Sequence, residues 1–270
     1  MLNQSFSNEP EAHDPSIQAL IALARPSRRI VAFTGAGIST ESGIPDYRGP
    51  GGVWQTGQIP TISDFRTNPK TRRAYWEGRR SRYPELAAKE PNRGHRALTA
   101  LQRAGRVGEI ITQNIDGLHQ KAGSDPATVI ELHGSSHRVS CLACGRVWPA
   151  ATIHDRLLAG EVEPDCEICG GMLRGATILF GESLPLDALR SATSAATTCD
   201  LMLVVGSSLV VNPAAKLPVL ARGGGASLAI VNRTPTPLDG VADVVVRSDA
   251  GPTLSAVAEA LGRGALAQPA

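Results

Sequence analysis

The chain has 270 residues, of which 42% are hydrophobic and 19% charged, and its formal net charge is +2. This length allows a large core in one domain or two, and the composition is that of an ordinary globular protein. The near-neutral charge gives no reason to expect a nucleic-acid partner. No apolar run approaches the roughly 18 residues of a membrane span, and residues 1–14 lack the pattern of a secretory signal. We therefore expect a cytoplasmic protein without a membrane partner, with a monomer favoured.

Short apolar runs alternate with helical patterns along most of the chain. A helix is predicted to begin at Asp14-Pro15, because Asp caps helix starts and Pro fits the first turn. Strands are predicted at 29–34, 109–112, 129–132, 177–180, 201–205, 227–231 and 244–246, and further helices at 95–103, 186–197 and 253–261. This alternation indicates an α/β fold, in which a Rossmann-like parallel sheet carries helices on both faces.

Two segments interrupt the alternation and predict a second, smaller lobe. The first is rich in Arg, Gly and Pro, and the second contains two cysteine pairs. We expect a discontinuous Rossmann-like domain at 14–49, 92–138 and 175–263. The small domain is expected to combine a helical insertion at 50–91 with a zinc-binding module at 139–174, and residues 1–13 and 264–270 are expected as flexible tails.

Four of the five cysteines form two Cys-x2-Cys motifs, Cys141 with Cys144 and Cys166 with Cys169. In a reducing compartment such cysteines are expected as metal ligands or free thiols before disulfides. Two residues between thiolates let a tight turn direct both sulfurs at one ion, and four sulfurs leave no open position for a substrate. The pattern predicts one structural Zn²⁺, against the alternatives of unpaired thiols or a redox Cys-x-x-Cys. Cys199 stands apart and is expected as a small buried side chain.

A glycine loop, GAGIST, follows the first predicted strand. Gly35 and Gly37 allow backbone N–H groups to approach a pyrophosphate, and Ser39 and Thr40 add hydroxyl donors. The usual dinucleotide fingerprint has a third glycine where Thr40 stands, and an acidic residue about 20 residues further on, which is missing here. A hydride-transferring dehydrogenase is therefore the weakest interpretation of this loop.

Seven motifs follow one another between about residues 28 and 250: GAGISTESGIPDYRG, TQNIDGLHQKAG, ELHGS, the cysteine pairs, FGE, GSSLVVNPAA and IVNRTPTP. In content and in order, these motifs resemble the sirtuin family of NAD-dependent protein deacylases, and the class II branch in particular. The resemblance implies that an acyl group passes from lysine to ADP-ribose, with release of nicotinamide and O-acyl-ADP-ribose. It also implies acyl-lysine proteins as substrates and NAD as co-substrate.

The resemblance assigns roles residue by residue. His133 is implied as the general base, with Asn114 and Asp116 as polar groups at the nicotinamide ribose. An extended substrate peptide is expected to pair with the strand edge at Phe180, Gly181 and Glu182. The implied cofactor contacts are Gly35, Ala36, Gly37, Ser39, Thr40, Asp46, Tyr47, Arg48, Trp54, Gln113, Asn114, Ile115, Asp116, Gly206, Ser207, Ser208, Asn232, Arg233, Thr234 and Ala250.

The chemistry is consistent with the base assigned to His133, because histidine titrates near neutral pH and follows a predicted strand where ligands meet a parallel sheet. The other histidines, at positions 13, 95, 119, 137 and 154, are expected at helix ends or on the surface.

Several alternatives remain at this stage. Mono-ADP-ribosyl transfer would use the same NAD pocket, and acetyl, long-chain and lipoyl-type acyl groups all fit the motifs. A zinc-ribbon nucleic-acid binder is disfavoured by the near-neutral charge. Family members that remove acidic acyl groups pair a Tyr with an Arg three residues later, whereas Tyr75 is followed at that distance by Gly78. This difference disfavours acidic acyl groups. Gly175 stands where many relatives carry proline.

Overall fold

The computed structural model describes residues 14–46 and 60–265 of the chain. The expectations for Tyr47, Arg48, Trp54, His13 and the N-terminal tail lie outside these described residues. Among the residues that it describes, no helix combines the length and apolar character that a membrane span requires.

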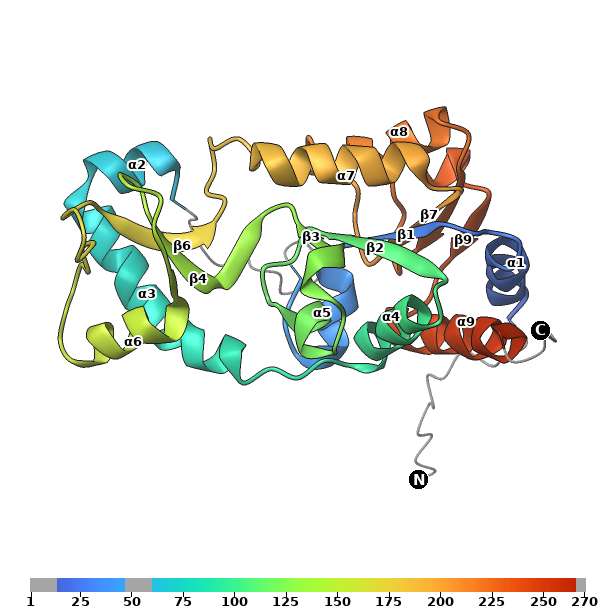
Figure 1. Ribbon diagram of the computed structural model, residues 1–270, viewed down its shortest axis with the longest axis horizontal. Helices are drawn as coiled ribbons and strands as arrows, with labels where there is room; N and C mark the ends of the chain where they lie inside the picture. Colours follow the sequence, from blue (N-terminus) through green and yellow to red (C-terminus); the bar gives the residue numbers. More distant parts are fainter. Residues whose placement is uncertain (1–13, 47–59, 266–270) are drawn as a thin grey trace, which may run out of the picture.

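The larger lobe is built on a six-stranded sheet in the order β3-β2-β1-β7-β8-β9, and every neighbouring pair is parallel (Figure 1). Its strands are β1 (Ile30–Thr34), β2 (Val107–Thr112), β3 (Val129–Glu131), β7 (Leu201–Val205), β8 (Ser227–Val231) and β9 (Val244–Val246). The chain runs from β1 outward to β3, and after the small lobe it returns to β7 at the centre of the sheet, so the strand order reverses between β1 and β7. The predicted Rossmann-like parallel sheet is confirmed.

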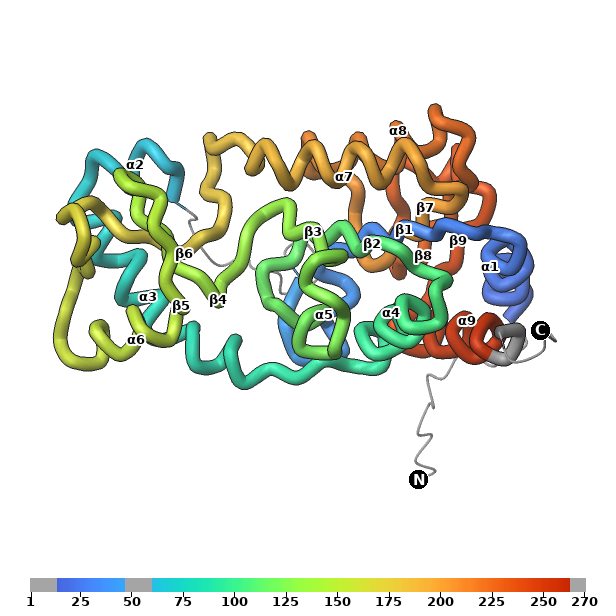
Figure 2. The backbone as a smooth tube through the Cα atoms, viewed as in Figure 1, coloured from blue at the N-terminus to red at the C-terminus, as the bar shows by residue number. Residues whose placement is uncertain are grey.

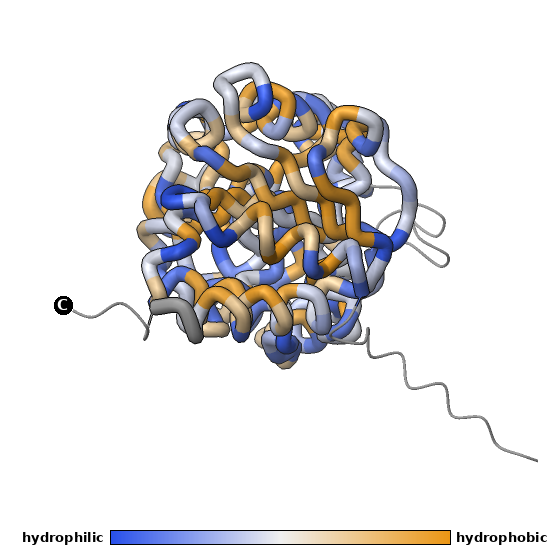
Figure 3. Tube along the Cα trace, turned by 90° about the vertical axis from the view of Figure 1, so that its right-hand side faces the viewer, coloured by the Kyte–Doolittle hydropathy of each residue, from blue (hydrophilic) through white to orange (hydrophobic). Residues whose placement is uncertain are grey.

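Helices cover both faces of this sheet. Successive side chains of a strand point to opposite faces, and because both sets are apolar here, both faces must be covered. Ile30 and Ala32 pack toward α1 (Pro15–Ala24), α4 (Arg93–Arg103) and α9 (Ala250–Ala265), whereas Val31 and Phe33 pack toward α7 (Leu186–Thr198) and α8 (Lys216–Gly223). Figure 3 shows the apolar strands enclosed between these helical layers. The remaining short elements of this lobe are η1 (Ala36–Ser42), α5 (Leu118–Lys121), η3 (Pro126–Thr128) and η4 (Asp239–Val241).

The smaller lobe combines the two segments that interrupt the alternation, and it lies at the left of Figures 1 and 2. A three-stranded antiparallel sheet, ordered β5-β4-β6, is formed by β4 (Gly134–Cys141), β5 (Val147–Pro149) and β6 (Leu173–Thr177). The helices α2 (Ile62–Thr67), α3 (Pro69–Ala87) and α6 (Ala150–Leu158) pack beside it. Trp76 and Val139 are fully buried in the core of this lobe.

One predicted strand is wrong. The run 177–180 does not form a strand, because β6 ends at Thr177 and joins the small sheet. The backbone N–H of Leu179 is instead taken by the Glu182 side chain at 2.8 Å, which removes it from any strand ladder. Phe180 makes only an isolated bridge to Thr61.

The expected boundaries between the two domains, at residues 138 and 175, fall inside strands β4 and β6 of the small sheet. At the C-terminus, α9 continues to Ala265, two residues into the segment expected as a tail.

Candidate active site

The loops after β1 and β7 meet at the carboxyl end of the sheet, at the point where the strand order reverses. Open α/β sheets bind ligands in the crevice at such a point. The N–H of Gly35 donates to the carbonyl of Val205 at 3.0 Å, and the N–H of Gly37 donates to the carbonyl of Gly206 at 2.8 Å. Gly206 has φ +62, and a Cβ there would lie 2.3 Å from the backbone nitrogen of Ile38. The two loops therefore touch through their backbones, with no room for a side chain.

A cavity of about 830 Å³ opens beside these loops and reaches the small lobe. This volume lies within the range of cofactor and substrate sites. Its walls include these predicted residues: Gly35, Ala36, Gly37, Ser39, Asp46, Gln113, Asn114, Ile115, Asp116, His133, Phe180, Gly181, Glu182, Gly206, Ser207, Ser208, Asn232 and Thr234. Most of the residues expected at the site are thus brought together from β1, β2, β3, β7 and β8 or the loops that follow them.

Of the predicted contacts within residues 14–46 and 60–265, three do not line the cavity. The hydroxyl of Thr40 donates to the carbonyl of Gly37 at 3.0 Å and supports the loop from within. Arg233 forms an ion pair with Asp249. Ala250 is buried at the first position of α9.

His133 lies in the tight connection between β3 and β4, and its imidazole is held by the backbone. Nδ1 lies 2.9 Å from the carbonyl oxygen of Gln113. A carbonyl can only accept, so Nδ1 carries the proton in the neutral ring and Nε2 keeps a lone pair. Burial lowers the pKa of His133, and the hydrogen bond to Gln113 opposes that shift. The ring is therefore neutral near pH 7 and suited to accept a proton at Nε2.

Asn114 and Asp116 join a buried network beneath the glycine loop. The carboxylate of Asp116 accepts from the Ser39 hydroxyl at 2.7 Å and from the backbone N–H of Leu118 at 2.9 Å. The amide of Asn114 donates to the carbonyl of Gly35 and to the Ser39 hydroxyl, both at 3.1 Å. Burial raises the pKa of Asp116, and the hydrogen bonds it accepts counteract this. These two side chains brace the loop as well as facing the cavity.

His95 and His119 lie in the first turns of α4 and α5, at helix ends as expected, but both side chains are fully buried. Their rings lie 5.0 Å apart, and His119 Nε2 is 2.9 Å from the hydroxyl of Thr34. Burial lowers the pKa of His95 to about 4, and the charge of Arg96 adds to this shift. Burial also lowers the pKa of His119 well below its ordinary value. Helical spacing in the sequence could have revealed that His95 is buried, since His95 lies one turn from the apolar Leu98 on the same face of α4.

His137 also departs from that expectation, because it lies on β4 rather than at a helix end. Its Nε2 is 2.7 Å from the carbonyl oxygen of Asp116. His154, on α6, is half-buried against Tyr83.

The expected substrate edge, Phe180 to Glu182, forms a turn on the cavity wall. Gly181 has φ +84, and Glu182 pairs with Arg174 at 2.9 Å. The carbonyl of Phe180 already accepts from the backbone N–H of Ile62 at 3.0 Å. Glu182 therefore stabilises the shape of the turn, and one side of the Phe180 backbone is occupied by the start of α2.

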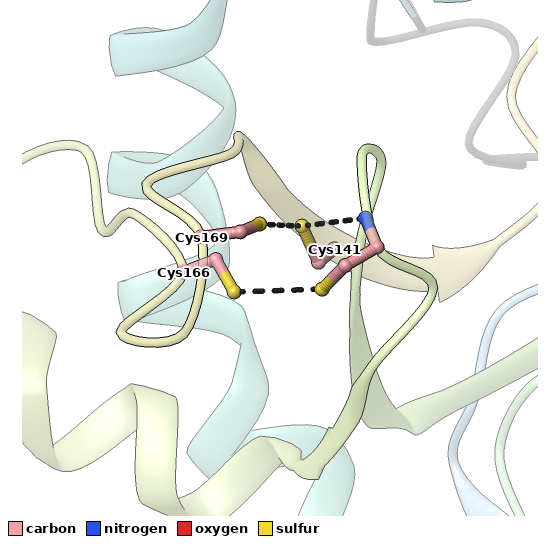
Figure 4. A group of neighbouring side chains, drawn as sticks. Cys141, Cys166 and Cys169 are labelled. Atoms are coloured by element: carbon pink, nitrogen blue, oxygen red, sulfur yellow. Dashed lines mark hydrogen bonds between the residues drawn. The ribbon is translucent and has the colours of Figure 1, made fainter.

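The four paired cysteines converge in the small lobe, between the turn after β4 and the loop before β6 (Figure 4). Their sulfurs lie within 4.8 Å of one another, with Cys141 to Cys169 at 3.6 Å and Cys144 to Cys166 at 3.7 Å. Tetrahedral Zn–S bonds of about 2.3 Å place neighbouring sulfurs about 3.8 Å apart, so the cluster has the dimensions of a zinc site. A disulfide requires sulfurs about 2 Å apart, which these are not.

The acid–base properties of the cluster also fit a bound cation. Burial raises the pKa of Cys141, but the amides of Cys144 and Ala143 outweigh it and lower that pKa to about 7. The amide of Gly171 lowers the pKa of Cys169, but the neighbouring sulfurs raise it to about 12. Without a cation, the thiols therefore cannot all ionise together. None of the four cysteines lines the cavity, so a zinc ion here would be structural. Cys199 is buried at the end of α7, and burial raises its pKa to about 11, in line with a packing role.

The sequence profile of the Sir2 family matches residues 35–213. The chain belongs to the Sir2 family. This confirms the resemblance to sirtuins carried by the motifs.

Similar proteins cover nearly the whole chain. A Rhodopseudomonas palustris protein named NAD-dependent protein deacetylase is 46% identical over 225 residues, which are 83% of this chain and 89% of that protein. An Archaeoglobus fulgidus protein named NAD-dependent protein deacylase 2 is 42% identical over 254 residues, which are 93% of this chain and 98% of that protein. A structure described as Sir2-p53 peptide-NAD+ matches with a TM-score of 0.82 and 36% identity, over 92% of this chain and 99% of that one.

The Sir2 fold accounts for the unusual glycine loop. From Ala36 the chain forms η1, a short 3-10 helix that includes Gly37, and not the long α-helix that follows a dinucleotide fingerprint. Gly43, with φ +73, ends η1 and turns the chain toward Asp46. Thr40 is half-buried within η1, and its hydroxyl bonds back to the carbonyl of Gly37.

Proposed function

We propose that this Sir2-family chain is an NAD-dependent protein lysine deacylase. It transfers the acyl group of an acyl-lysine to ADP-ribose and releases nicotinamide and O-acyl-ADP-ribose. The observation that carries the proposal is that one cavity contains both the two glycine loops and a neutral histidine oriented by a backbone carbonyl. The names of the similar proteins, deacetylase and deacylase, support the same chemistry.

NAD supplies a ribose carbon attached to a good leaving group, and the chain positions it. The backbones of Gly35, Gly37 and Gly206 let the two loops pack directly against each other, and all three residues line the part of the cavity that we assign to the pyrophosphate. Asn232 and Thr234, after β8, are assigned to the adenosine ribose. Neither Arg233 nor Ala250 lines the cavity. We propose their contacts with the adenosine on the resemblance to sirtuins alone.

His133 is assigned as the base. Its Nε2 accepts a proton from a ribose hydroxyl, while Nδ1–H stays bonded to Gln113 and fixes the ring. Asn114 and Asp116 stabilise positive charge at the ribose and hold Ser39 and the glycine loop in place. The burial of this network limits the access of water to the reacting atoms.

The substrate side is assigned to an extended peptide bearing the acyl-lysine, running along Phe180 to Glu182. Strand addition along this backbone is the mode of peptide recognition that the resemblance to sirtuins implies. The proposal also includes a monomeric enzyme and a cytoplasmic location. The location is supported by the thiol cluster, because a four-thiolate zinc site requires the reduced cysteines of a reducing compartment.

The decisive experiment incubates the protein with NAD and an acetyl-lysine peptide. We expect release of nicotinamide and formation of O-acetyl-ADP-ribose, both measured by mass spectrometry. An ADP-ribosylated protein product, without loss of the acetyl group, would instead identify the alternative transferase activity.

The His133→Ala variant is expected to reduce turnover to near background while retaining its fold and NAD binding. His154→Ala is the matched control, because His154 lies on α6 and does not line the cavity. Near-normal turnover by His133→Ala would refute the assigned base.

A further inference from the structure

Strand β4 departs from regular pairing in its first half. Gly134 pairs with Thr177 and Val139 pairs with Gly175, so five steps along β4 match two steps along β6. The extra residues lie at 135–138 and form a β-bulge, and bulges next to active sites redirect side chains out of the ladder. Residues of this bulge are therefore available to pair with another part of the molecule.

The bulge pairs with the loop that follows β2, residues 113–117. The backbone N–H of Ser136 donates to the carbonyl of Ile115 at 2.9 Å. Nε2 of His137 lies 2.7 Å from the carbonyl oxygen of Asp116. Because a carbonyl can only accept, Nε2 carries the proton of this hydrogen bond. Two consecutive residues of the bulge thus hold two consecutive carbonyls of the loop.

The imidazole of His137 fits closely against this loop. Gly117 has φ +70, and a Cβ there would lie 2.8 Å from Cδ2 of His137. The ring of Tyr83, on α3, meets the imidazole edge-on, with the two centroids 6.3 Å apart. From the same helix, Arg79, which lines the cavity, donates from Nη2 to the carbonyl of Ser136 at 2.6 Å. The bulge is therefore anchored to both lobes, and the imidazole has a fixed orientation.

The loop also carries the side chains assigned to the nicotinamide ribose, Asn114 and Asp116. The carboxylate of Asp116 is held in the buried network beneath the glycine loop, whereas its carbonyl accepts from His137. At the other end of the loop, the carbonyl of Gln113 orients His133. One loop thus connects the groups assigned to nicotinamide release with the assigned base, and His137 holds this loop from the strand that follows the base.

We propose that His137 is a positioning residue for the cleavage of NAD: its Nε2–H holds the carbonyl of Asp116 and so fixes Asn114 and Asp116 at the nicotinamide ribose. His137 does not line the cavity, so it acts through the loop and does not touch the substrate. The proposal rests on the deacylase function proposed above. It concerns the first step, in which the acyl oxygen bonds to the ribose carbon and nicotinamide leaves with the bonding electron pair.

Three substitutions of His137 separate its N–H from its packing. Glutamine places an amide N–H about as far from the backbone as Nε2, asparagine places its amide nearer, at the position of Nδ1, and phenylalanine keeps a ring without a donor. The measurement is the exchange of labelled nicotinamide into NAD in the presence of an acetyl-lysine peptide, which reports the first step and its reversal. We expect about 10-fold slower exchange in His137→Phe and His137→Asn, the effect of one lost hydrogen bond, and recovery to near the parent rate in His137→Gln.

Binding gives a second readout. Calorimetric titration should show weaker binding of NAD to His137→Phe but unchanged binding of ADP-ribose, because ADP-ribose lacks the nicotinamide. His154→Phe is the matched control. His154 also packs against Tyr83, with ring centroids 5.2 Å apart, but it lies on α6, and within residues 14–46 and 60–265 it makes no hydrogen bond to the loop. Exchange and NAD binding in this control should equal those of the parent chain.

Parent-level exchange in His137→Phe would overturn the proposal. An equal loss in all three variants at position 137 would also overturn it, because the packing of the ring and not its N–H would then be responsible. A measurement on the parent chain covers the case in which the variants fail to fold. Nitrogen-15 NMR of histidine-labelled protein in alkaline buffer should show His137 as the Nε2–H tautomer, and an Nδ1–H tautomer would refute the hydrogen bond on which the proposal depends.

The deacylase function and the role of His137 can fail separately. Deacylation of the peptide, with parent-level exchange in His137→Phe, would keep the function and reject the role. Absence of deacylation, with NAD binding that weakens in His137→Phe and recovers in His137→Gln, would reject the function and keep His137 as the residue that positions the loop.

Discussion

The histidines at positions 95, 119 and 133 lie near the glycine loop and differ in what their ring nitrogens face. His95 and His119 are enclosed by Ser39, Thr34 and each other, and neither lines the cavity. His133 lines the cavity and presents Nε2 with its lone pair, because Nδ1 is committed to a carbonyl. The same residue type thus has two roles, and the partner of the second nitrogen decides between them.

This arrangement predicts the pH dependence of the reaction. Burial lowers the pKa of His133 below its ordinary 6.5, so the neutral base persists to lower pH than in an exposed histidine. We expect the acid limb of the kcat/KM profile to have its midpoint below pH 6.5. Steady-state kinetics between pH 5 and 8 with an acetyl-lysine peptide would measure it, and a midpoint clearly above 6.5 would contradict the assigned environment.

Single residues were predictable where their role is local. Asp14 caps α1 as expected, with its side chain accepting from the Ser16 N–H at 2.8 Å, because capping depends only on neighbouring residues. The cysteine pairs likewise predict a cluster through their spacing. Arg79 was not predictable as a cavity residue, because its position depends on contacts with Ser136 and Gly175, which are distant in the sequence.

At the scale of elements, the cap of α4 is also a support of the glycine loop. Asn92 Oδ1 accepts from the N–H of Gly94 at 2.9 Å, as an N-cap does. Its Nδ2 donates to the carbonyl of Ile38 at 2.7 Å and to the Ser42 hydroxyl at 3.0 Å, both in η1. One buried amide therefore couples the start of a core helix to the loop that borders the cavity.

Removing this coupling should have two effects. We expect Asn92→Ala to lower the free energy of unfolding by about 2–3 kcal/mol, because it removes a cap and leaves the Ile38 carbonyl unsatisfied. NAD affinity should also fall, since η1 loses its support. Asn68→Ala is the matched control: Asn68 caps α3 in an exposed position, so it should cost about 1 kcal/mol and leave NAD affinity unchanged. Denaturant unfolding and calorimetric titration measure the two effects, and equal NAD affinity in both variants would contradict the coupling.

Elements were predictable where periodicity and burial agree. The central strands of the parallel sheet are continuous apolar runs buried on both faces, and β1, β7 and β8 lie within one residue of prediction. The error at 177–180 arose because an apolar run does not have to join a strand ladder: only Leu179 of this run is buried, and the Glu182 side chain takes its backbone N–H. The small sheet escaped prediction altogether, because β4 reads GSSHRVSC and lacks a hydrophobic pattern.

At the scale of the whole molecule, β4 links the two lobes. This eight-residue strand begins at Gly134, next to His133, and ends at Cys141 in the thiol cluster. We therefore expect order at the thiol cluster to be transmitted along this strand to the connection that holds His133.

Metal removal should consequently affect turnover without dissolving the larger lobe. We expect about one zinc per chain, and chelation should increase hydrogen exchange in β4, β5 and β6 and lower turnover while the parallel sheet stays protected. Cys199→Ser should keep its zinc, because Cys199 lies in the other lobe's core. A metal-free protein with full activity would contradict a structural role for the ion.

Buried neutral histidines also make global stability depend on pH. The pKa of His95 is about 4 in the folded chain and about 6.5 when unfolded, so the unfolded state binds more protons between these values. Stability should therefore fall as the pH drops below 6.5, and His95 alone contributes a loss of roughly 2 kcal/mol at pH 5. His119 and His133 act in the same direction, because burial lowers their pKa values too.

Asp116 acts in the opposite direction, since its raised pKa lets the folded state take up a proton first, but it is one group against three. Urea unfolding at pH 7 and pH 5 measures the total. His95→Gln isolates one part of it, because glutamine can bond to Ser39 and Asn92 without titrating. The loss between pH 7 and pH 5 should be smaller by about 2 kcal/mol in that variant, and zinc release at low pH is common to both proteins. An identical loss in the variant and the parent chain would show that His95 is not buried in its neutral form.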